Sequence, residues 1–551
     1  MKKIVIAISL LGILVGCNKF LDMTPRDRVS DKVMWATTES AEFAVNSIYS
    51  YAYDIFAYWP SSVGITEAFT DEFKYGSYVN FAYCLIPSQV AYGGTNLTNS
   101  FVDVYLGCWG SLYDAIRRTN EALYNLHTLG TDLPAAVQTR LDGELRLMRG
   151  WLYFELIKRY KEVILYDEDL TAITPDKGVS TQAQGWDFVW KDLDAAAKVL
   201  PAKADAAGRL DKGCAWALET RAMLYAKEWD KVIDAADSLA GKYPLMPNYA
   251  DAFTKGMASG NTEAILQYTF SYKYGVTHDF DFYYTPGGDY KIIGQQGGGY
   301  GTPTQEMVES YELADGSGFP DWSTWHGTTV ADPPYALLEP RFQATVLYNG
   351  ASWKERKIEP FVGGTDGWCQ WNKEPQPQGR TTTGYYLRKF VDETHDLALV
   401  SQSTQHFVLL RYGEVLLNKA EACFQKGDEA GANAAIKEIR ARVGLPYSDK
   451  SGTALWNAIR QERRVELAFE GQWYWDLRRW EEAAQDYPVG LNNYQVHGLK
   501  IESTAVAGQF KYTYVSVDDK DRNFPAKMYR FPIPESELNA NKAITQYPEW
   551  N

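Results

Sequence analysis

Segments with helical periodicity recur along this chain in neighbouring pairs, and they constrain its fold more than any other feature. The clearest segments are Phe101–Leu129, Leu133–Tyr160, Trp186–Leu200, Lys212–Ala240, Phe407–Gln425 and Asp428–Arg442. A further helix is expected to begin near Thr38. Within the second segment, small and large apolar residues alternate at helical positions, as packed antiparallel helices require. The pattern predicts a mostly α-helical protein built from stacked helix pairs.

The spacing of these pairs is irregular but close to about 34 residues, the length of a tetratricopeptide repeat. The run AWALETRAMLYAKEWDKVIDAADSL, which lies within Lys212–Ala240, resembles one such unit. Repeats of this kind stack into a solenoid, because each pair buries its apolar face against its neighbours. We therefore expect a tetratricopeptide-like helical-pair solenoid as the scaffold.

Two stretches, 71–100 and 243–404, lack this period and are rich in Tyr, Gly, Asn and Pro. The longer one includes TPGGDYKIIGQQGGGYGTP and one expected strand at Ala264–Phe270. Aromatic residues make up 14% of the chain, which is too many for a disordered segment that avoids a core. We expect 243–404 to be a folded, loop-rich, irregular subdomain with few short strands, and 71–100 to be a loop insertion in the helical part 38–242.

The stretch Ile459–Trp480, IRQERRVELAFEGQWYWDLRRW, carries a dense set of charges among aromatic residues. Helical spacing predicts one mostly apolar stripe and one charged stripe: Val465, Ala468, Phe469, Gln472 and Trp473 form the first, and Glu462, Arg463, Glu466 and Glu470 the second. Gly471 then allows a turn. Paired carboxylates can perform acid and base chemistry. We favour a structural helix pair in which partly buried charges neutralise one another.

The N-terminus has the pattern of a bacterial export signal. Lys2 and Lys3 precede an apolar run that is too short to cross a bilayer, which needs about 20 residues. The run ends in Leu-Val-Gly-Cys, which resembles a lipobox with Cys17 as the lipidated residue. We expect 1–16 to be a signal peptide and 17–37 to be a lipidated tether, held to a membrane by acyl chains.

Four segments in order resemble the RagB/SusD family of surface glycan-binding lipoproteins of Bacteroidetes. They are the lipobox with FLD close behind it, LRYGEVLLNKAEA, IRARVGLP followed by the ERR-x-E to DLRRW stretch, and FPIPESELNANKAITQYPEW at the end. The last lies in the part 405–551, and its prolines predict an extended tail that wraps over the surface. Trp473 and Tyr547 depart from the family pattern at positions that look structural.

The resemblance implies a lipoprotein on the outer face of the outer membrane, with a tetratricopeptide-like scaffold that supports an irregular glycan-binding face. It also implies delivery of captured oligosaccharides to a SusC-like TonB-dependent barrel transporter, as in polysaccharide utilisation. The family's signature motifs are scaffold motifs and assign no binding residues. We expect a non-catalytic glycan receptor. The alternatives are a peptide-binding or protein-binding receptor of the RagB type and a glycoside hydrolase.

A sugar binder needs aromatic platforms beside hydrogen-bonding groups, and the two irregular stretches supply both. The candidate ligand-binding residues are Tyr75, Tyr78, Tyr83, Tyr92, Asn96, Tyr283, Tyr284, Tyr290, Tyr300, Trp322, Trp325, Trp368 and Trp371. Any one of these aromatics is more often a packing residue than a ligand contact. Charged residues that could fix hydroxyl groups are Asp71, Lys74, Asp289 and Arg380.

Other functions have less support in the sequence. The net charge of −15, without a basic block, argues against a nucleic-acid partner. The catalytic motifs of metalloproteases, α/β-hydrolases and P-loop enzymes are absent, and no cofactor is expected. Two acidic pairs, Asp279 with Asp281 and Asp315 with Asp321, could ligate calcium but fit no EF-hand loop, so we expect no metal site. The cysteines after Cys17 are expected to be small buried residues.

Overall fold

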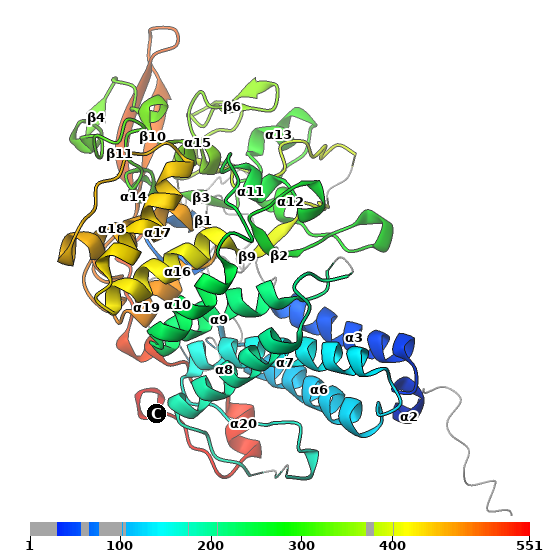
Figure 1. Cartoon of the computed structure of the whole chain (residues 1–551). Helices are drawn as coiled ribbons and strands as arrows, with labels where there is room; N and C mark the ends of the chain where they lie inside the picture. Colours follow the sequence, from blue (N-terminus) through cyan, green and yellow to red (C-terminus); the bar gives the residue numbers. More distant parts are fainter. Residues whose placement is uncertain are drawn as a thin grey trace, which may run out of the picture.

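The computed structural model describes residues 30–56, 66–75, 98, 102, 106–172, 174, 176–205, 208–370, 379–399 and 402–551. Helices fill the lower and middle parts of the molecule in Figure 1, and short strands and loops fill its upper part. The fold is mostly α-helical with a few short strands, as predicted.

The long helices form one stack in which neighbours along the chain pack against each other. They are α3 (Thr38–Phe56), α6 (Trp109–Thr128), α7 (Ala135–Tyr160), α8 (Gln182–Val199), α9 (Lys212–Ala226), α10 (Trp229–Leu239), α16 (Tyr412–Gln425), α17 (Glu429–Arg442) and α18 (Gly452–Glu466). Their apolar faces share one continuous core. The predicted segment Lys212–Ala240 is a helix pair because Lys227 adopts a positive φ of 61° between α9 and α10. The expected helical-pair solenoid is confirmed.

Shorter helices complete the chain outside this stack. They are α2 (Asp31–Met34), α11 (Asp251–Thr254), α12 (Phe280–Tyr284), α13 (Gly287–Ile292), α14 (Gln305–Val308), α15 (Pro340–Thr345), α19 (Trp473–Arg479) and α20 (Glu535–Ala540). Five of them, α11 to α15, belong to the loop-rich part, where Gly and Pro keep helical runs short.

The strands pair antiparallel in small sheets. The pairs are β1 (Phe73–Tyr75) with β3 (Gly301–Pro303), β2 (Ala264–Tyr268) with β9 (Phe407–Arg411), β5 (Val346–Leu347) with β8 (Tyr386–Leu387), and β6 (Ser352–Trp353) with β7 (Arg356–Lys357). A three-stranded sheet has the order β10 (His497–Ser503), β11 (Phe510–Ser516) and β4 (Thr328–Thr329). The strand expected at Ala264–Phe270 is confirmed as β2.

The loop-rich part lies between two successive helices of the solenoid. Helix α10 packs directly on α16, although the whole of 243–404 separates them in sequence. Strands β2 and β9 pair where the chain leaves and re-enters the stack. This part has its own aromatic core, which includes Phe280, Phe342, Trp353 and Tyr385. The aromatic content of 243–404 therefore forms a second folded core, as expected.

Two details of the sequence-based secondary structure are wrong. Phe407–Arg411 was expected to begin a helix, but it is strand β9, because its backbone pairs with β2. The apolar stripe of Ile459–Trp480 does not lie on one helix, since α18 ends at Glu466 and Phe469 and Gly471 both adopt positive φ. The turn expected at Gly471 is present.

The charges of Ile459–Trp480 are buried and paired. Glu466 accepts from Arg411 at 2.7 Å and from Arg341 at 3.1 Å, and also pairs with Arg442. Burial alone would raise the pKa of Glu466, but the three guanidinium groups outweigh it and hold the pKa below its usual value. The charges are neutralised in ion pairs, as expected, but Glu462, Glu466 and Glu470 pair with cations from outside the stretch, whereas Asp476 pairs within it.

The C-terminal residues wrap over the solenoid. The backbone N–H of Phe531 donates to Arg159 at 2.9 Å, and the Asn541 amide donates to Lys177 at 2.8 Å. The Tyr547 hydroxyl donates to the carbonyl of Glu162 at 2.9 Å, so this departure from the family pattern has a packing role. The red segment in Figure 1 follows this path past α20. The expected surface-wrapping tail is present, interrupted by α20.

The Glu466 network predicts a large stability effect. The substitution Glu466→Gln leaves Arg411, Arg341 and Arg442 short of one buried anion, so we expect the free energy of unfolding to fall by about 3 kcal/mol. Urea titration followed by circular dichroism measures it. Lys198→Ala, which breaks an exposed pair with Asp194, should cost less than about 0.5 kcal/mol. Equal midpoints for the two variants would contradict a structural role for the network.

Candidate functional site

The two irregular stretches meet where β1 pairs with β3. Tyr75 lies opposite Gly301 in this ladder, and the hydroxyl groups of Tyr75 and Tyr284 are 3.3 Å apart. The C-terminal end of β1 therefore lies beside β3 and α12. The structure thus brings together the two stretches from which the candidate site was drawn.

Close backbone approach explains the glycine-rich run between α13 and β3. Gly298 has a φ of +71°, and a Cβ at this position would lie 2.3 Å from the carbonyl oxygen of Thr285. A Cβ on Gly287 would lie 1.7 Å from the carbonyl oxygen of Gly379. Only glycine permits such contacts. The run is thereby held against α12, which carries Tyr283 and Tyr284.

Most of the predicted platform residues within the described ranges are buried. The exposed fractions are 1% for Tyr75, 0% for Tyr284, 1% for Tyr290, 6% for Tyr300 and 6% for Trp322. All but Tyr290 belong to the aromatic core of the loop-rich part, and Tyr290 packs on Phe282. The expectation that these five rings face solvent is wrong, because their apolar faces are needed to fill that core.

Three predicted rings, those of Tyr283, Trp325 and Trp368, are half-buried. The Tyr283 ring lies 4.6 Å from that of Tyr300, and the Trp325 indole packs edge-on against Trp322 at 5.6 Å. Buried neighbours fix the rings of Tyr283 and Trp325 in place, while part of each side chain remains accessible. Such rigid, partly exposed rings are suited to contact with the apolar face of a sugar.

Trp368 also offers polar groups. Its indole nitrogen is buried and has no hydrogen-bond partner among the described residues. Lys500 lies 5.5 Å from the Trp368 ring, and Arg380, next to Thr381 in the bridge with Trp368, is half-buried without an ion pair in the described ranges. An N–H donor and a guanidinium beside a half-buried ring can bind hydroxyl oxygens.

The other charged candidate residues form ion pairs within the protein. Asp71 pairs with Arg464 at 2.8 Å, and Lys74 pairs with Asp518 at 2.7 Å. Asp289 accepts from Arg356 at 2.6 Å. These three candidates are buried, so they position the backbone and offer no free group to a ligand.

The ionisation of Asp289 follows from these partners. Burial alone would raise the pKa of its carboxyl, but Lys354 and Arg356 outweigh burial and hold the pKa below its usual range. The carboxylate therefore remains charged and bound to its cations near neutral pH.

Sequence reasoning missed two exposed aromatics in a turn after β2. Tyr272 and Tyr274 are 53% and 72% exposed, and the Tyr272 hydroxyl donates to the carbonyl of Gln402 at 2.7 Å. A bridge between Ser271 and Val276 closes the turn, and Gly275 adopts a φ of 68°. The run SYKYGV, with alternating tyrosines before a glycine, carries this signal in the sequence.

A second missed feature joins residues that are distant in sequence. The Tyr514 ring on β11 lies between the imidazoles of His326 and His497, at 4.7 Å and 4.3 Å. His326 and His497 hydrogen-bond to Glu309 and Glu306. No local pattern predicts this stack, because it depends on the pairing of β4, β10 and β11.

The remaining predicted site residues lie outside the described residues. They are Cys17, Tyr78, Tyr83, Tyr92, Asn96 and Trp371. Their roles stay predictions.

Two further features of the described ranges concern metal binding and membrane spanning. In these ranges no three His, Cys, Asp or Glu side chains are grouped closely enough to hold a metal ion. Asp281 accepts from His395 at 2.9 Å and from the backbone of Asp392 at 3.0 Å, so its oxygens already have partners. None of the described helices combines the length and the apolar character needed to cross a bilayer.

Comparisons with known proteins find SusD-like sequences along the whole chain. A model described as the SusD family matches residues 262–550, and one described as starch-binding associating with outer membrane matches 19–224. A SusD-like protein of Bacteroides ovatus is 22% identical over all of this chain and 95% of its own length. A SusD-like protein of Formosa agariphila is 24% identical over 86% of this chain and 90% of its own length.

Solved structures show the same fold. A SusD-like protein from Bacteroides fragilis superposes with a TM-score of 0.75 at 25% identity, covering 95% of this chain and 99% of its own. A SusD-like carbohydrate-binding protein from the same organism gives 0.72 at 22% identity, covering 93% and 100%. A laminarin-binding SusD-like protein gives 0.58 at 21% identity, covering 93% and 99%.

The burial of the candidate rings can be tested by stability measurements. Trp322→Ala removes a core indole, so we expect the free energy of unfolding to fall by about 3 kcal/mol. Tyr274→Ala removes a ring that packs on little else and should cost less than about 0.5 kcal/mol. Guanidinium titration followed by Trp fluorescence measures both. A small loss for Trp322→Ala would mean that its ring is not a packing residue.

Proposed function

Because the chain belongs to the SusD family, we propose that it is a cell-surface glycan-binding lipoprotein that captures oligosaccharides. The rings of Tyr283 and Trp325, which pack on the aromatic core and remain partly accessible, carry the proposal, together with the half-buried Trp368. The carbohydrate-binding and laminarin-binding relatives support a sugar as ligand. The solenoid serves as the rigid support for these loops.

We further propose that the protein acts without cleaving its ligand and passes it to a SusC-like TonB-dependent transporter in the outer membrane. Support comes from the matched model that is described as associating with the outer membrane. The dense carboxylates of Ile459–Trp480 are saturated by arginines, so they do not provide a free acid and base pair. The anchor is the acylated Cys17 that the lipobox implies.

Glycan binding is tested with the whole chain carrying Cys17→Ser, which prevents lipidation. A glycan array identifies a bound oligosaccharide, and calorimetry then compares Tyr283→Ala, Trp325→Ala and Trp368→Ala with the parent protein. Each substitution should weaken binding by roughly tenfold, because it removes an apolar contact face. The matched control is Leu337→Ala, an exposed apolar residue of the same part of the chain that should leave affinity unchanged.

Two results would contradict this proposal and assign a different function. A blank glycan array together with depletion of a peptide mixture would identify a peptide receptor of the RagB type. New reducing ends after incubation with a bound polysaccharide would identify a glycoside hydrolase.

The lipid anchor is tested separately in cells. Cys17→Ser should move the protein from the outer-membrane fraction to the soluble fraction, because stable attachment requires the acyl chains. Immunoblotting of fractions with and without surface protease treatment measures both attachment and orientation. Retention of the Cys17→Ser protein in the membrane fraction would show that another segment anchors it.

A further inference from the structure

Two adjoining hollows lie among the solenoid helices, apart from the loop-rich site. The first, of about 450 Å³, is lined by α7, α8, α9, α19 and Tyr529, and the second, of about 460 Å³, by α9, α10, α16, α18 and α19. Tyr225, Lys227 and Arg479 line both. We call the two together the solenoid groove. Among the predicted glycan-binding aromatics that the structure describes, none lines it.

Arg478 in the first hollow is a buried cation that lacks an anion. It is 5% exposed, and its side chain donates to the carbonyl oxygens of Met528 and Tyr529. Its Nε has no hydrogen-bond partner, and no carboxylate pairs with it in the part of the chain that the structure describes. Aromatic faces of Trp475 and Phe531 lie 4.9 Å and 4.5 Å from the guanidinium carbon.

This environment is costly for a charge. Burial lowers the pKa of Arg478, whereas the buried Arg411 has its pKa raised, because the carboxylates around Arg411 outweigh burial. A buried guanidinium without an anion is destabilising, and a planar oxyanion would satisfy it with paired hydrogen bonds. Arg478 therefore points to a negatively charged ligand group.

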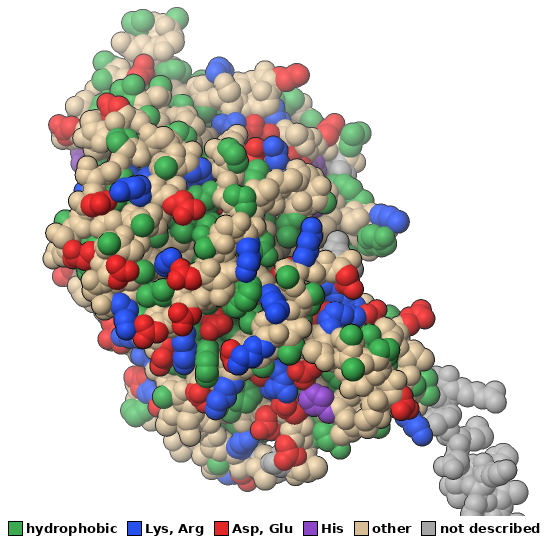
Figure 2. Space-filling view, viewed as in Figure 1, with side chains coloured by type: hydrophobic (Ala, Val, Ile, Leu, Met, Phe, Trp, Pro, Cys, Tyr) green, Lys and Arg blue, Asp and Glu red, His purple; other side chains and the backbone are tan. Residues whose placement is uncertain are grey.

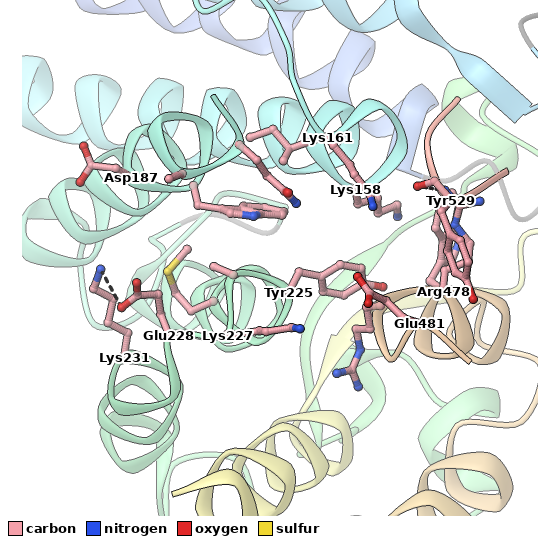
Figure 3. Close-up of a pocket in the computed structure, with 18 residues that line it drawn as sticks. Lys158, Lys161, Asp187, Tyr225, Lys227, Glu228, Lys231, Arg478, Glu481 and Tyr529 are labelled. Carbon is pink, nitrogen blue, oxygen red and sulfur yellow. Dashed lines mark hydrogen bonds and ion pairs between the residues drawn. The ribbon is translucent and has the colours of Figure 1, made fainter. Parts of the chain in front are cut away.

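Other positively charged groups line the same hollow. Lys161, which follows the last residue of α7, and Lys227 make no ion pair within the described ranges. The first turn of α8 also lines the hollow, and the N-terminus of an 18-residue helix carries partial positive charge. Figure 3 shows Lys161, Lys227 and Tyr225 around one space, with Arg478 at its edge near Tyr529.

Three acidic residues line the first hollow, and one of them, Glu481, interacts electrostatically with Lys161. Asp187 pairs with Lys191 at 2.6 Å, and Glu228 lies 3.6 Å from Lys231. Glu481 is exposed and makes no ion pair among the described residues. Figure 2 shows Lys and Arg side chains interspersed with Asp and Glu over the middle of the molecule, where α8 to α10 lie. A local surplus of cations in a chain of net charge −15 favours an anionic ligand.

The second hollow adds aromatic faces. Trp229, Phe424, Trp456 and Trp480 line it, and all four are half-buried. Phe424 and Trp456 are stacked at 5.4 Å with an interplanar angle of 20°, and Trp480 packs edge-on against Trp456 at 5.4 Å. Partly exposed indoles in a wet groove suit the C–H face of a sugar ring better than they suit an extended acidic peptide.

We propose that the solenoid groove is a second ligand site, which binds an acidic saccharide. A sugar ring lies against the aromatic residues around Trp456, and a carboxylate or sulfate on the saccharide lies among Arg478, Lys161 and Lys227. This site is separate from the loop-rich face, so it can exist whether or not that face binds a neutral glycan.

The test is calorimetry of the Cys17→Ser chain with oligogalacturonate, its methyl-esterified form and a chondroitin sulfate oligosaccharide. We expect one or both acidic probes to bind and the neutral ester to bind at least about tenfold more weakly, because charged hydrogen bonds are lost. The double variant Lys161→Gln/Lys227→Gln should weaken the acidic probe by about tenfold or more. Trp456→Ala should weaken it by a similar factor.

Matched variants separate the groove from general charge effects. Lys198→Gln/Lys437→Gln removes the same charge from exposed ion pairs that line neither hollow, and should leave affinity unchanged. Trp325→Ala in the loop-rich part should also leave it unchanged. Arg478→Lys keeps the charge but loses the planar fork, and should weaken binding in a protein whose unfolding midpoint shows that it is folded.

Three results would overturn the proposal. They are equal affinity for the acidic and esterified saccharides, no binding of either acidic probe, and unchanged affinity in the Lys161→Gln/Lys227→Gln variant. Binding of a Glu-rich peptide in the groove, with no saccharide bound, would assign the groove to a protein partner instead.

Discussion

The buried ion network around Glu466 is the interaction on which the rest of the structure depends. Its members come from distant parts of the chain, with Arg411 at the end of β9, Arg341 on α15 and Arg442 on α17. Glu263, just before β2, joins the network through Arg411 at 2.7 Å. These ion pairs hold the solenoid against the loop-rich part. They lie where the paired strands β2 and β9 connect the two parts of the chain. Desolvated charges tolerate little displacement, so the network sets a single docking geometry.

A rigid support of this kind matters for the proposed binding surface. The half-buried rings of Tyr283, Trp325 and Trp368 stand on short helical turns and loops, which hold their positions only when their backbones are anchored. Here the anchors are an aromatic core and close glycine contacts such as that of Gly298 with Thr285. Rings positioned in advance lose little conformational freedom when a ligand binds.

The solenoid has surfaces of its own besides its supporting role. Its arginines are mostly neutralised in pairs, as Arg479 is by Glu421 at 2.6 Å. Arg478, the next residue on α19, instead donates to neutral carbonyl groups and faces aromatic rings. Adjacent arginines thus differ in their partners, and the acidic-saccharide site that we propose rests on this difference.

The sequence by itself determined the helical solenoid, the folded nature of 243–404 and the structural role of the Ile459–Trp480 charges, because periodicity, aromatic content and charge spacing are local properties. It could not decide which rings face solvent: Trp322 and Trp325 are three residues apart, yet one fills the core and the other is half-exposed. Nor could it show that Phe407–Arg411 is a strand, or that Arg478 lacks an anion. Exposure, strand pairing and counter-ions depend on contacts between segments far apart in sequence, and only the tertiary structure brings those segments together.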